Sequence, residues 1–233
     1  MLKKSYRSAD LSRREVLQWI AASAVLGGLL PWRSLHAAGV LAQDAGIVRM
    51  KGKVNVNGKP ASVGQLVKLG DQIETMQDAE VVFVVGKDAY LQRGGSRIRL
   101  ENASGKSAAQ VLRLFSGRVL AVFAKGDSQI KTPTVTLGIR GTGVYVEADP
   151  DKTYVCLCYG SADYTPSAQP EHTISQTTTY HDKPLWIYAD PNKEIMAAAP
   201  PINHTDAELT MLEALVGRLP PFAGMEGIKH HGY

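Results

Sequence analysis

The sequence has few cysteines and few aromatic residues. Only two of its 233 residues are cysteines, and aromatic side chains make up 7% of it. Two cysteines exclude a disulfide-rich scaffold, in which several bridges replace a hydrophobic core. Hydrophobic residues account for 44% of the chain, which is enough for a core of its own and excludes wholesale disorder. The composition therefore predicts a folded globular protein.

The chain after residue 37 also has no excess of positive or negative charge. The formal net charge is +4, but residues 1–37 hold six basic and two acidic side chains, which leaves 20 of each sign elsewhere. A formally neutral body offers no basic stripe that could follow a phosphate backbone. We therefore expect no nucleic acid among the partners.

No hydrophobic run is long enough to cross a membrane. The apolar run at residues 20–30 is shorter than the roughly 20 residues that a spanning helix needs. It follows Arg13 and Arg14 and precedes small residues that suit a peptidase at Ala37. This order resembles a twin-arginine export signal. We expect residues 1–37 to be a removable signal helix, and the mature protein to be soluble, periplasmic and without a transmembrane anchor.

Residues 46–160 show a strand pattern almost throughout. Residues 81–85 are a continuous apolar run, typical of a strand that is covered on both faces, and residues 96–100 alternate between polar and apolar. Residues 57–58 (Asn-Gly) predict a type I′ hairpin turn, and residues 116–118 (Ser-Gly-Arg) predict a second hairpin between two apolar runs. Short strands separated by turn residues predict an all-β fold: a compact β-sandwich, a β-roll or a short β-helix-like stack.

The C-terminal part is more varied. Residues 161–201 are polar and contain several prolines, which predicts a β extension followed by a linker. Thr205 and Glu208 have the spacing of a capping box and precede a leucine stripe, so we expect one C-terminal α-helix. Residues 202–222 hold this helix and a proline-rich end, and residues 223–233 are predicted to be a flexible tail.

The segment at residues 130–146 reads IKTPTVTLGIRGTGVYV. It resembles the signature of the FecR domain, a periplasmic module first known from ferric citrate sensing, and residues 52–54, 67–75 and 114–119 agree with it. The resemblance covers residues 46–160 and implies a β-rich fold that recognises an envelope protein or a small ligand. The family's sensors carry a cytoplasmic sigma-factor-binding region and a transmembrane helix before the domain. Because the leader here is removable, we expect a stand-alone exported module without direct control of a sigma factor.

The glycines of this motif permit positive φ or a close backbone approach, which predicts a bulge or a tight bend between strands. Arg140 offers five fixed donors. They suit several carbonyls or a carboxylate, and we favour an internal contact that satisfies loop carbonyls over a contact with a ligand or partner. The candidate partner-binding residues of the motif are Thr132, Pro133, Gly138, Arg140, Gly141 and Thr142.

The two cysteines lie on a predicted strand. Cys156 and Cys158 share one face with Tyr154, while Tyr159 is expected on the other face. They are either two small buried residues or a disulfide, which would need a bent backbone because an extended strand holds their Cα atoms about 6.6 Å apart. The further interpretation is a site for a soft metal such as copper(I) or zinc.

Histidines would complete such a metal site. We name His181 or His204 for this role, although no histidine pair has the spacing of a helical His-x-x-x-His site. Asp182 beside His181 could orient its imidazole, as carboxylates do around metals. His204 stands just before the predicted helix, where a capping or hydrophobic contact is the simpler interpretation.

No pattern typical of an enzyme is present. No serine lies in a nucleophile elbow, and the paired glycines at residues 94–95 lack the following helix that phosphate binding needs. We expect a non-catalytic periplasmic binding or sensing module of the FecR type that recognises an envelope protein or a small ligand. The alternative is a metal-binding or thiol-redox protein that uses Cys156 and Cys158. The sequence alone names no cofactor.

Overall fold

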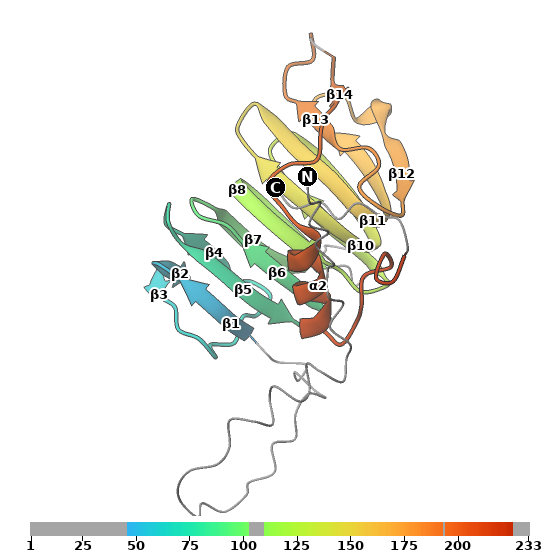
Figure 1. The fold of residues 1–233 in the computed structure, drawn as a ribbon. Helices are drawn as coiled ribbons and strands as arrows, with labels where there is room; N and C mark the ends of the chain where they lie inside the picture. The colour runs from blue at the N-terminus through green and yellow to red at the C-terminus, as the bar shows by residue number, and fades with distance from the viewer. Residues whose placement is uncertain (1–45, 103–109, 193, 226–233) are drawn as a thin grey trace, which may run out of the picture. The chain divides into compact units, whose positions relative to one another are not determined.

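The computed structural model describes residues 46–102, 110–192 and 194–225 (Figure 1). Strands form most of this part of the chain, and an α-helix, α2 (Asp206–Leu215), follows them. This confirms the predicted all-β fold with a single C-terminal helix.

Several predictions concern residues outside this description. The signal helix with Arg13, Arg14 and the cleavage position Ala37 belongs to them, and so do the last residues of the predicted tail. Within the described ranges, no helix has the length and apolar character needed to span a membrane.

The strands belong to one connected sheet of 14 strands. All strand pairs are antiparallel except that of β8 with β9, which is parallel. A short 3-10 helix, η1 (Pro170–His172), lies between two of the strands. The strands are β1 (Gly46–Lys51), β2 (Val54–Val56), β3 (Lys59–Pro60), β4 (Gln72–Thr75), β5 (Glu80–Val85), β6 (Asp88–Gln92), β7 (Arg97–Asn102), β8 (Gln110–Val122), β9 (Asp127–Lys131), β10 (Val135–Ala148), β11 (Lys152–Pro166), β12 (Ile174–Thr178), β13 (Leu185–Tyr188) and β14 (Met196–Ala198).

The sheet branches because its three longest strands change partners along their length. The first half of β8 pairs with β7 and β9, and its second half pairs with β6 and β10. In the same way, β11 pairs with β13 near its start and with β12 near its end. The long strands therefore connect two layers, one around β5, β6 and the second half of β8, the other around β4, β7 and β9.

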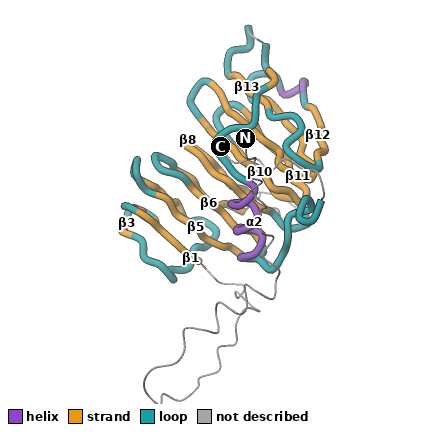
Figure 2. Tube along the Cα trace, in the orientation of Figure 1, coloured by secondary structure: helices purple, strands orange, loops and turns teal. Residues whose placement is uncertain are grey.

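Two apolar clusters follow from this arrangement. Val119 and Ala121 of β8 point into the cluster between the layers, while Leu120 and Val122 point to a second cluster on the other face. The helix α2 packs its leucines Leu209 and Leu212 into this second cluster, and it lies beside β6 and β8 (Figures 1 and 2). The layer that contains β5 is thus covered on both faces, which explains its continuous apolar run.

The predicted hairpin at residues 116–118 is wrong. β8 runs without interruption through these residues. Gly117 has a φ of +90°, and the register with β7 shifts between Arg97 and Ile98, so the strand bends and continues instead of reversing. A glycine between two apolar runs is as typical of a bulged strand as of a turn.

Other local predictions are confirmed. Asn57 and Gly58 both have positive φ, as a type I′ turn requires. Arg97 and Arg99 are exposed while Ile98 and Leu100 between and beyond them are buried. Capping of α2 is also as predicted, since the side chain of Thr205 accepts from the Glu208 N–H, and the Glu208 carboxylate accepts from the Thr205 N–H.

Candidate metal centre

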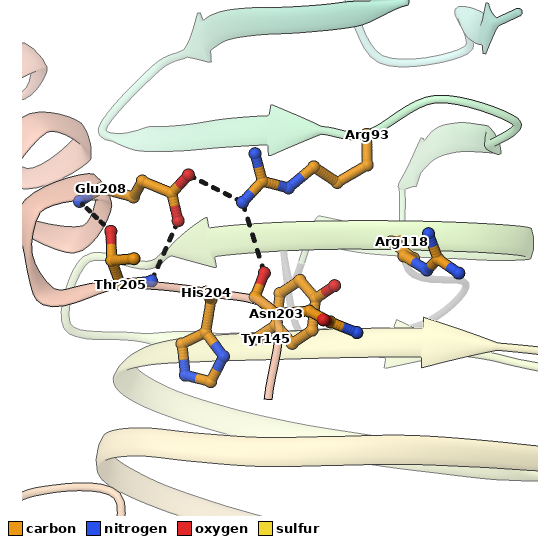
Figure 3. A pocket seen from close by; sticks show the side chains of 7 residues that line it. All are labelled: Arg93, Arg118, Tyr145, Asn203, His204, Thr205 and Glu208. Atoms are coloured by element: carbon orange, nitrogen blue, oxygen red, sulfur yellow. Dashed lines mark hydrogen bonds and ion pairs between the residues drawn. The ribbon is translucent and has the colours of Figure 1, made fainter. Parts of the chain in front are cut away.

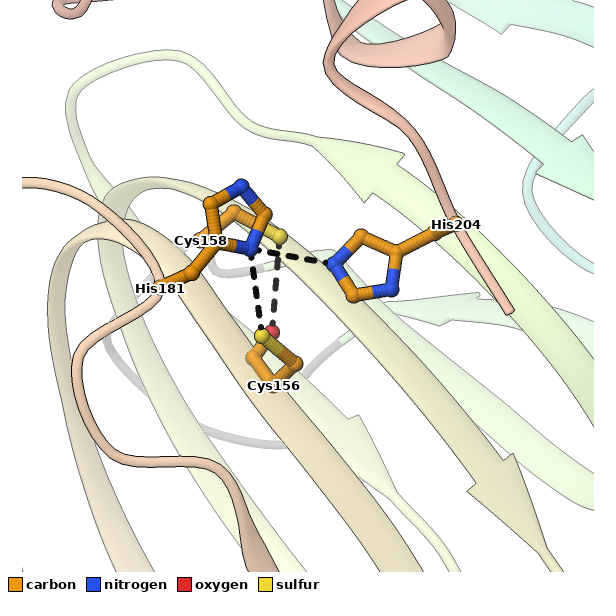
Figure 4. Close-up of side chains that lie close together, drawn as sticks. All are labelled: Cys156, Cys158, His181 and His204. Carbon is orange, nitrogen blue, oxygen red and sulfur yellow. Dashed lines mark hydrogen bonds between the residues drawn. The ribbon is translucent and has the colours of Figure 1, made fainter. Parts of the chain in front are cut away.

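Four side chains that bind metals meet inside the second apolar cluster: Cys156, Cys158, His181 and His204 (Figure 4). Their ligand atoms all lie within 4.8 Å of one another, and each residue is at most 4% exposed. They come from three separate parts of the chain: β11, the turn after β12, and the residues just before α2. Both histidines that the sequence offered as alternatives are therefore present at the same site.

A β-bulge in β11 presents the two cysteines. Gly143 of β10 is opposite Tyr159, and the next residue, Val144, is opposite Leu157, so Cys158 is the extra residue of the bulge. The prediction that Tyr159 faces away from the cysteines is wrong, because the bulge turns its side chain to their face, into the second apolar cluster. Both cysteines are free thiols in this structure.

Left-handed backbone conformations place the two histidines. His181 has a φ of +44°, and its N–H donates to the Cys158 carbonyl at 3.0 Å. Asn203, directly before His204, has a φ of +58°. Such conformations cost about 1–3 kcal/mol for a residue with a side chain and persist where the surroundings impose them. Two of them beside one cluster indicate that the imidazoles are held in place.

The outer nitrogen of each imidazole is oriented by an oxygen. His204 Nδ1 lies 2.6 Å from the Ile202 carbonyl, which can only accept, so this nitrogen carries the proton. His181 Nε2 lies 3.2 Å from Asp206 Oδ1, and this carboxylate favours a proton there. Asp206, and not the neighbouring Asp182 that the sequence suggested, is thus the carboxylate that orients His181. The cap of α2 is Thr205, so His204 does not have the capping role expected for it.

The inner nitrogens then face each other with their lone pairs. His181 Nδ1 and His204 Nε2 are 3.1 Å apart. With both outer nitrogens protonated, neither neutral ring has a proton to donate across this distance. A cation bound between the rings turns this repulsion into two bonds, and metal-binding histidines generally donate their other N–H to an oxygen in the same way.

The spacing of the donor atoms fits a tetrahedral metal ion. Zinc bonds of about 2.05 Å to nitrogen and about 2.3 Å to sulfur separate two nitrogens by about 3.3 Å, and a nitrogen from a sulfur by about 3.6 Å. The two inner nitrogens are 3.1 Å apart, and Cys156 Sγ is 3.4 Å from His181 Nδ1. These two distances therefore lie close to the zinc values, and all four donors lie within 4.8 Å of one another.

The two thiols differ in their acidity. The pKa of Cys156 is lowered to about 3, first by the Cys158 thiol and then by His181 and His204, against the opposing effect of burial. Burial, and then the neighbouring Cys156, raise the pKa of Cys158 well above its usual value. The lowered pKa of Cys156 favours its thiolate, which is the form of cysteine that binds metals.

Aromatic and acidic residues surround the cluster. Tyr145 stacks on the His204 ring with centroids 4.7 Å apart, and the Phe222 ring lies 5.3 Å from that of Tyr180. The Tyr180 hydroxyl donates to Asp206 Oδ2 at 2.6 Å. Asp206 is the first residue of α2, where the helix dipole favours a negative charge. The surroundings thus hold the carboxylate that faces His181.

A pocket of about 280 Å³ reaches His204 from the side of the helix start (Figure 3). Arg93 crosses it and binds Glu80 and Glu208, with N–O distances of 2.9 and 2.7 Å. The pocket is lined by Arg93, Arg118, Tyr145, Asn203, His204, Thr205 and Glu208.

The FecR-like motif lies apart from the metal cluster. Arg140 forms two contacts with Asp163 of β11, at 2.9 and 2.8 Å, and its side chain is half exposed. It thus contacts a carboxylate across the strand pair, and not the loop carbonyls that the favoured interpretation expected. Thr132 and Pro133 form the turn between β9 and β10, and Gly141, with a φ of +58°, lies where the β10–β11 register shifts. Gly138 and Thr142 of the motif lie within β10, which runs without interruption. The glycines of the motif therefore bend one continuous strand and do not form a turn between two strands.

Comparisons with known proteins give little further information. No family model and no curated protein matches the chain. Two crystal structures of a candidate anti-sigma factor from Parabacteroides distasonis match 55% of this chain and 58% of that one, which is less than two thirds of its length, with 11% identity and a TM-score of 0.44. A similarity this weak assigns neither a family nor a function.

Proposed function

We propose that the protein is an exported, non-catalytic binding module of the FecR type and that its ligand is one zinc ion. Cys156, Cys158, His181 and His204 are the four ligands. The observation that carries this proposal is the pair of imidazoles whose outer nitrogens face Asp206 and the Ile202 carbonyl, while their inner nitrogens converge with the thiols.

When both cysteines bind as thiolates, charge balance favours zinc over copper(I). Two thiolates and two neutral imidazoles neutralise a divalent cation, whereas a monovalent cation leaves a net negative charge in the apolar cluster. A buried net charge is costly. The nearby carboxylate of Asp206 adds to this cost for the monovalent ion, since it lies against His181. Zinc binding also removes the proton that burial keeps on Cys158.

A closed set of ligands supports a binding role over a catalytic one. Catalytic zinc sites have three protein ligands and leave a fourth position for water or substrate, whereas structural and binding sites use four. Here four protein donors surround one point, and all four are buried. The FecR resemblance adds a second, independent reason, since it implies recognition of an envelope protein or a small ligand without chemistry.

Metal analysis of the mature protein tests the proposal. We expect one zinc per chain after purification, and one cobalt(II) after exchange, with the visible absorption of a tetrahedral thiolate complex. Cys156→Ser is expected to lose both signals, because it removes a thiolate ligand. His172→Ala is the matched control, since His172 is exposed in η1 and lies outside the cluster.

Two outcomes would contradict the proposal. One is a protein that binds no zinc when it is refolded or titrated with the ion at micromolar concentration. The other is a Cys156→Ser variant that keeps the full metal content and the cobalt spectrum, which would place the metal elsewhere.

A further inference from the structure

The ligands of the metal site connect the C-terminal segment (residues 202–222) to the sheet. The segment contains α2, whose Leu209 and Leu212 are fully buried against apolar residues of β6 and β8. It supplies one ligand, His204, and the carboxylate of Asp206 that faces the ligand His181. The remaining ligands belong to β11 and to the turn after β12.

His204 and Asp206 flank the first turn of α2. Thr205 between them is the N-cap residue, so a bond from a metal to His204 fixes the position at which the helix begins. If this end of the helix moved away from the sheet, the metal would lose His204, and His181 would lose its carboxylate. Metal binding and docking of this helix end are therefore one coupled equilibrium.

Without a metal, this interface keeps only its other contacts: Glu208 binds Arg93 at 2.7 Å, and Asp206 accepts from the Tyr180 hydroxyl at 2.6 Å. The inner nitrogens of His181 and His204 face each other at 3.1 Å, and both thiols are buried beside them. Asn203 is in a left-handed conformation immediately before His204. A cation that joins the four ligands adds its bonds to these contacts, so the helix start is held more firmly with the metal than without it.

The far end of the helix is held independently of the metal. The Glu213 carboxylate accepts hydrogen bonds from the Tyr159 hydroxyl and from Arg218, which also donates to the Lys87 carbonyl at 2.7 Å. Glu213 is 3% exposed, so its carboxylate is buried. The C-terminal end of α2 thus stays attached to the body when the start of the helix is free to move.

We propose that the zinc site is a latch: zinc keeps the start of the C-terminal segment docked, and loss of zinc releases residues 202–212 while residues 213–222 remain attached. The inference rests on the proposed function, since it needs the same four ligands. Release uncovers an apolar face of the sheet. The surface of the protein therefore differs between its zinc-bound and zinc-free forms. This face is formed by Val82, Val84, Leu91, Leu120 and Val122.

Hydrogen exchange of the mature protein, with zinc and after chelation, tests the latch. We expect amides in residues 206–212 to exchange at least about tenfold faster after chelation, because local opening sets their exchange rate. Amides of β8 and β10 and those after Glu213 are expected to keep their rates. A hydrophobic dye should bind only the chelated protein, at the uncovered face.

A variant separates the latch from zinc binding as such. His204→Ala removes the one ligand that the C-terminal segment supplies. Amides in residues 206–212 of this variant should therefore exchange fast with or without zinc. His172→Ala should behave like the unmodified protein. Since the comparison of zinc-loaded and chelated protein needs no substitution, the latch remains testable if His204→Ala fails to fold.

The outcomes distinguish the two proposals. A protein that binds one zinc but shows equal exchange in residues 206–212 in both states overturns the latch and leaves the proposed function intact. Chelation that accelerates exchange in every strand also overturns it, since the metal then supports the whole fold. A protein that binds no zinc contradicts the proposed function itself.

Discussion

Asp206 links two features of the molecule through one carboxylate. Its Oδ1 faces His181, its Oδ2 accepts from the Tyr180 hydroxyl, and its backbone begins α2. A carboxylate at this position favours the His181 tautomer whose Nδ1 can bind a metal. Asp206 is therefore a positioning residue for the metal site, although it contributes no ligand.

Replacing this carboxylate tests its role. Asp206→Asn should lower zinc affinity about 10- to 100-fold, because the amide neither holds the His181 proton as strongly nor raises the basicity of the ring. The measurement is competition with a chromogenic chelator, together with the cobalt(II) spectrum, whose bands should shift. Asp182→Asn is the matched control, since Asp182 is exposed beside His181 and the ring does not use its carboxylate. Equal affinities for the two variants would contradict the role of Asp206.

At this scale the sequence named the four side chains that meet in the cluster, but not the groups that orient them. Cys156 and Cys158 share a face because residues two apart on a strand do so, and His181 and His204 were candidates by residue type alone. The link between His181 and Asp206 spans 25 residues and depends on how α2 docks. No local pattern contains this information, and the acidic neighbour Asp182 pointed to the wrong carboxylate.

Bulged strands are the elements that shape this fold. Gly117 lets β8 bend between its two sets of partners, and the bulge at Cys158 turns β11 toward the cluster. A glycine between two apolar runs occurs both in hairpins and in bulged strands, and the sequence alone does not distinguish them. The prediction at residues 116–118 chose the hairpin, which is the commoner structure. The pairing partners decide between the two, and these lie more than twenty residues away in β6 and β10.

A pair of glycine substitutions measures how closely β8 approaches β7 at its bend. Gly117 and Gly70 have φ values of +90° and +100°, so alanine strains the backbone similarly at both. A Cβ at Gly117 would lie 2.3 Å from Ser96 Oγ and 2.5 Å from Ser96 Cα, whereas a Cβ at Gly70 would have no atom within 4 Å. We expect Gly70→Ala to cost about 1 kcal/mol and Gly117→Ala about 2–4 kcal/mol.

Urea unfolding of the two variants gives the comparison directly. The expected result is a clearly lower midpoint for Gly117→Ala, with an unchanged dependence of the free energy of unfolding on urea concentration. Equal midpoints would show that the strand bends away from Ser96 without cost.

In the described part of the chain, the layer that contains β5 and β6 has an apolar cluster on each of its two faces. Strands with continuous apolar runs, such as β5, contact both clusters, while alternating strands such as β7 contact only the cluster between the layers. The two patterns could be read from the sequence, and with them the all-β class. The branching of the sheet could not, because it depends on long strands that change partners, and strand length was underestimated wherever a glycine interrupted the pattern.

At the scale of the whole molecule, the export route decides whether zinc can bind before or after the protein crosses the membrane. The expected twin-arginine signal belongs to a route that carries folded proteins, often with their cofactors in place, so a zinc ion could be bound before export. Arg13→Lys combined with Arg14→Lys should leave the precursor in the cytoplasm, because the paired arginines are the element that this route recognises. Cell fractionation with an antibody against the mature protein measures the distribution, and Arg7→Lys, which changes an arginine outside the pair, is the matched control.

Normal export of the double variant would show that the general secretory route is used. That route threads unfolded chains, and zinc would then have to be acquired after export, when the C-terminal segment closes over Cys156 and Cys158. Zinc content of the stranded precursor decides between the two orders of events. One zinc per chain in the cytoplasm means that the latch is closed before the protein leaves, whereas a metal-free precursor that folds and then takes up zinc places the binding step in the envelope.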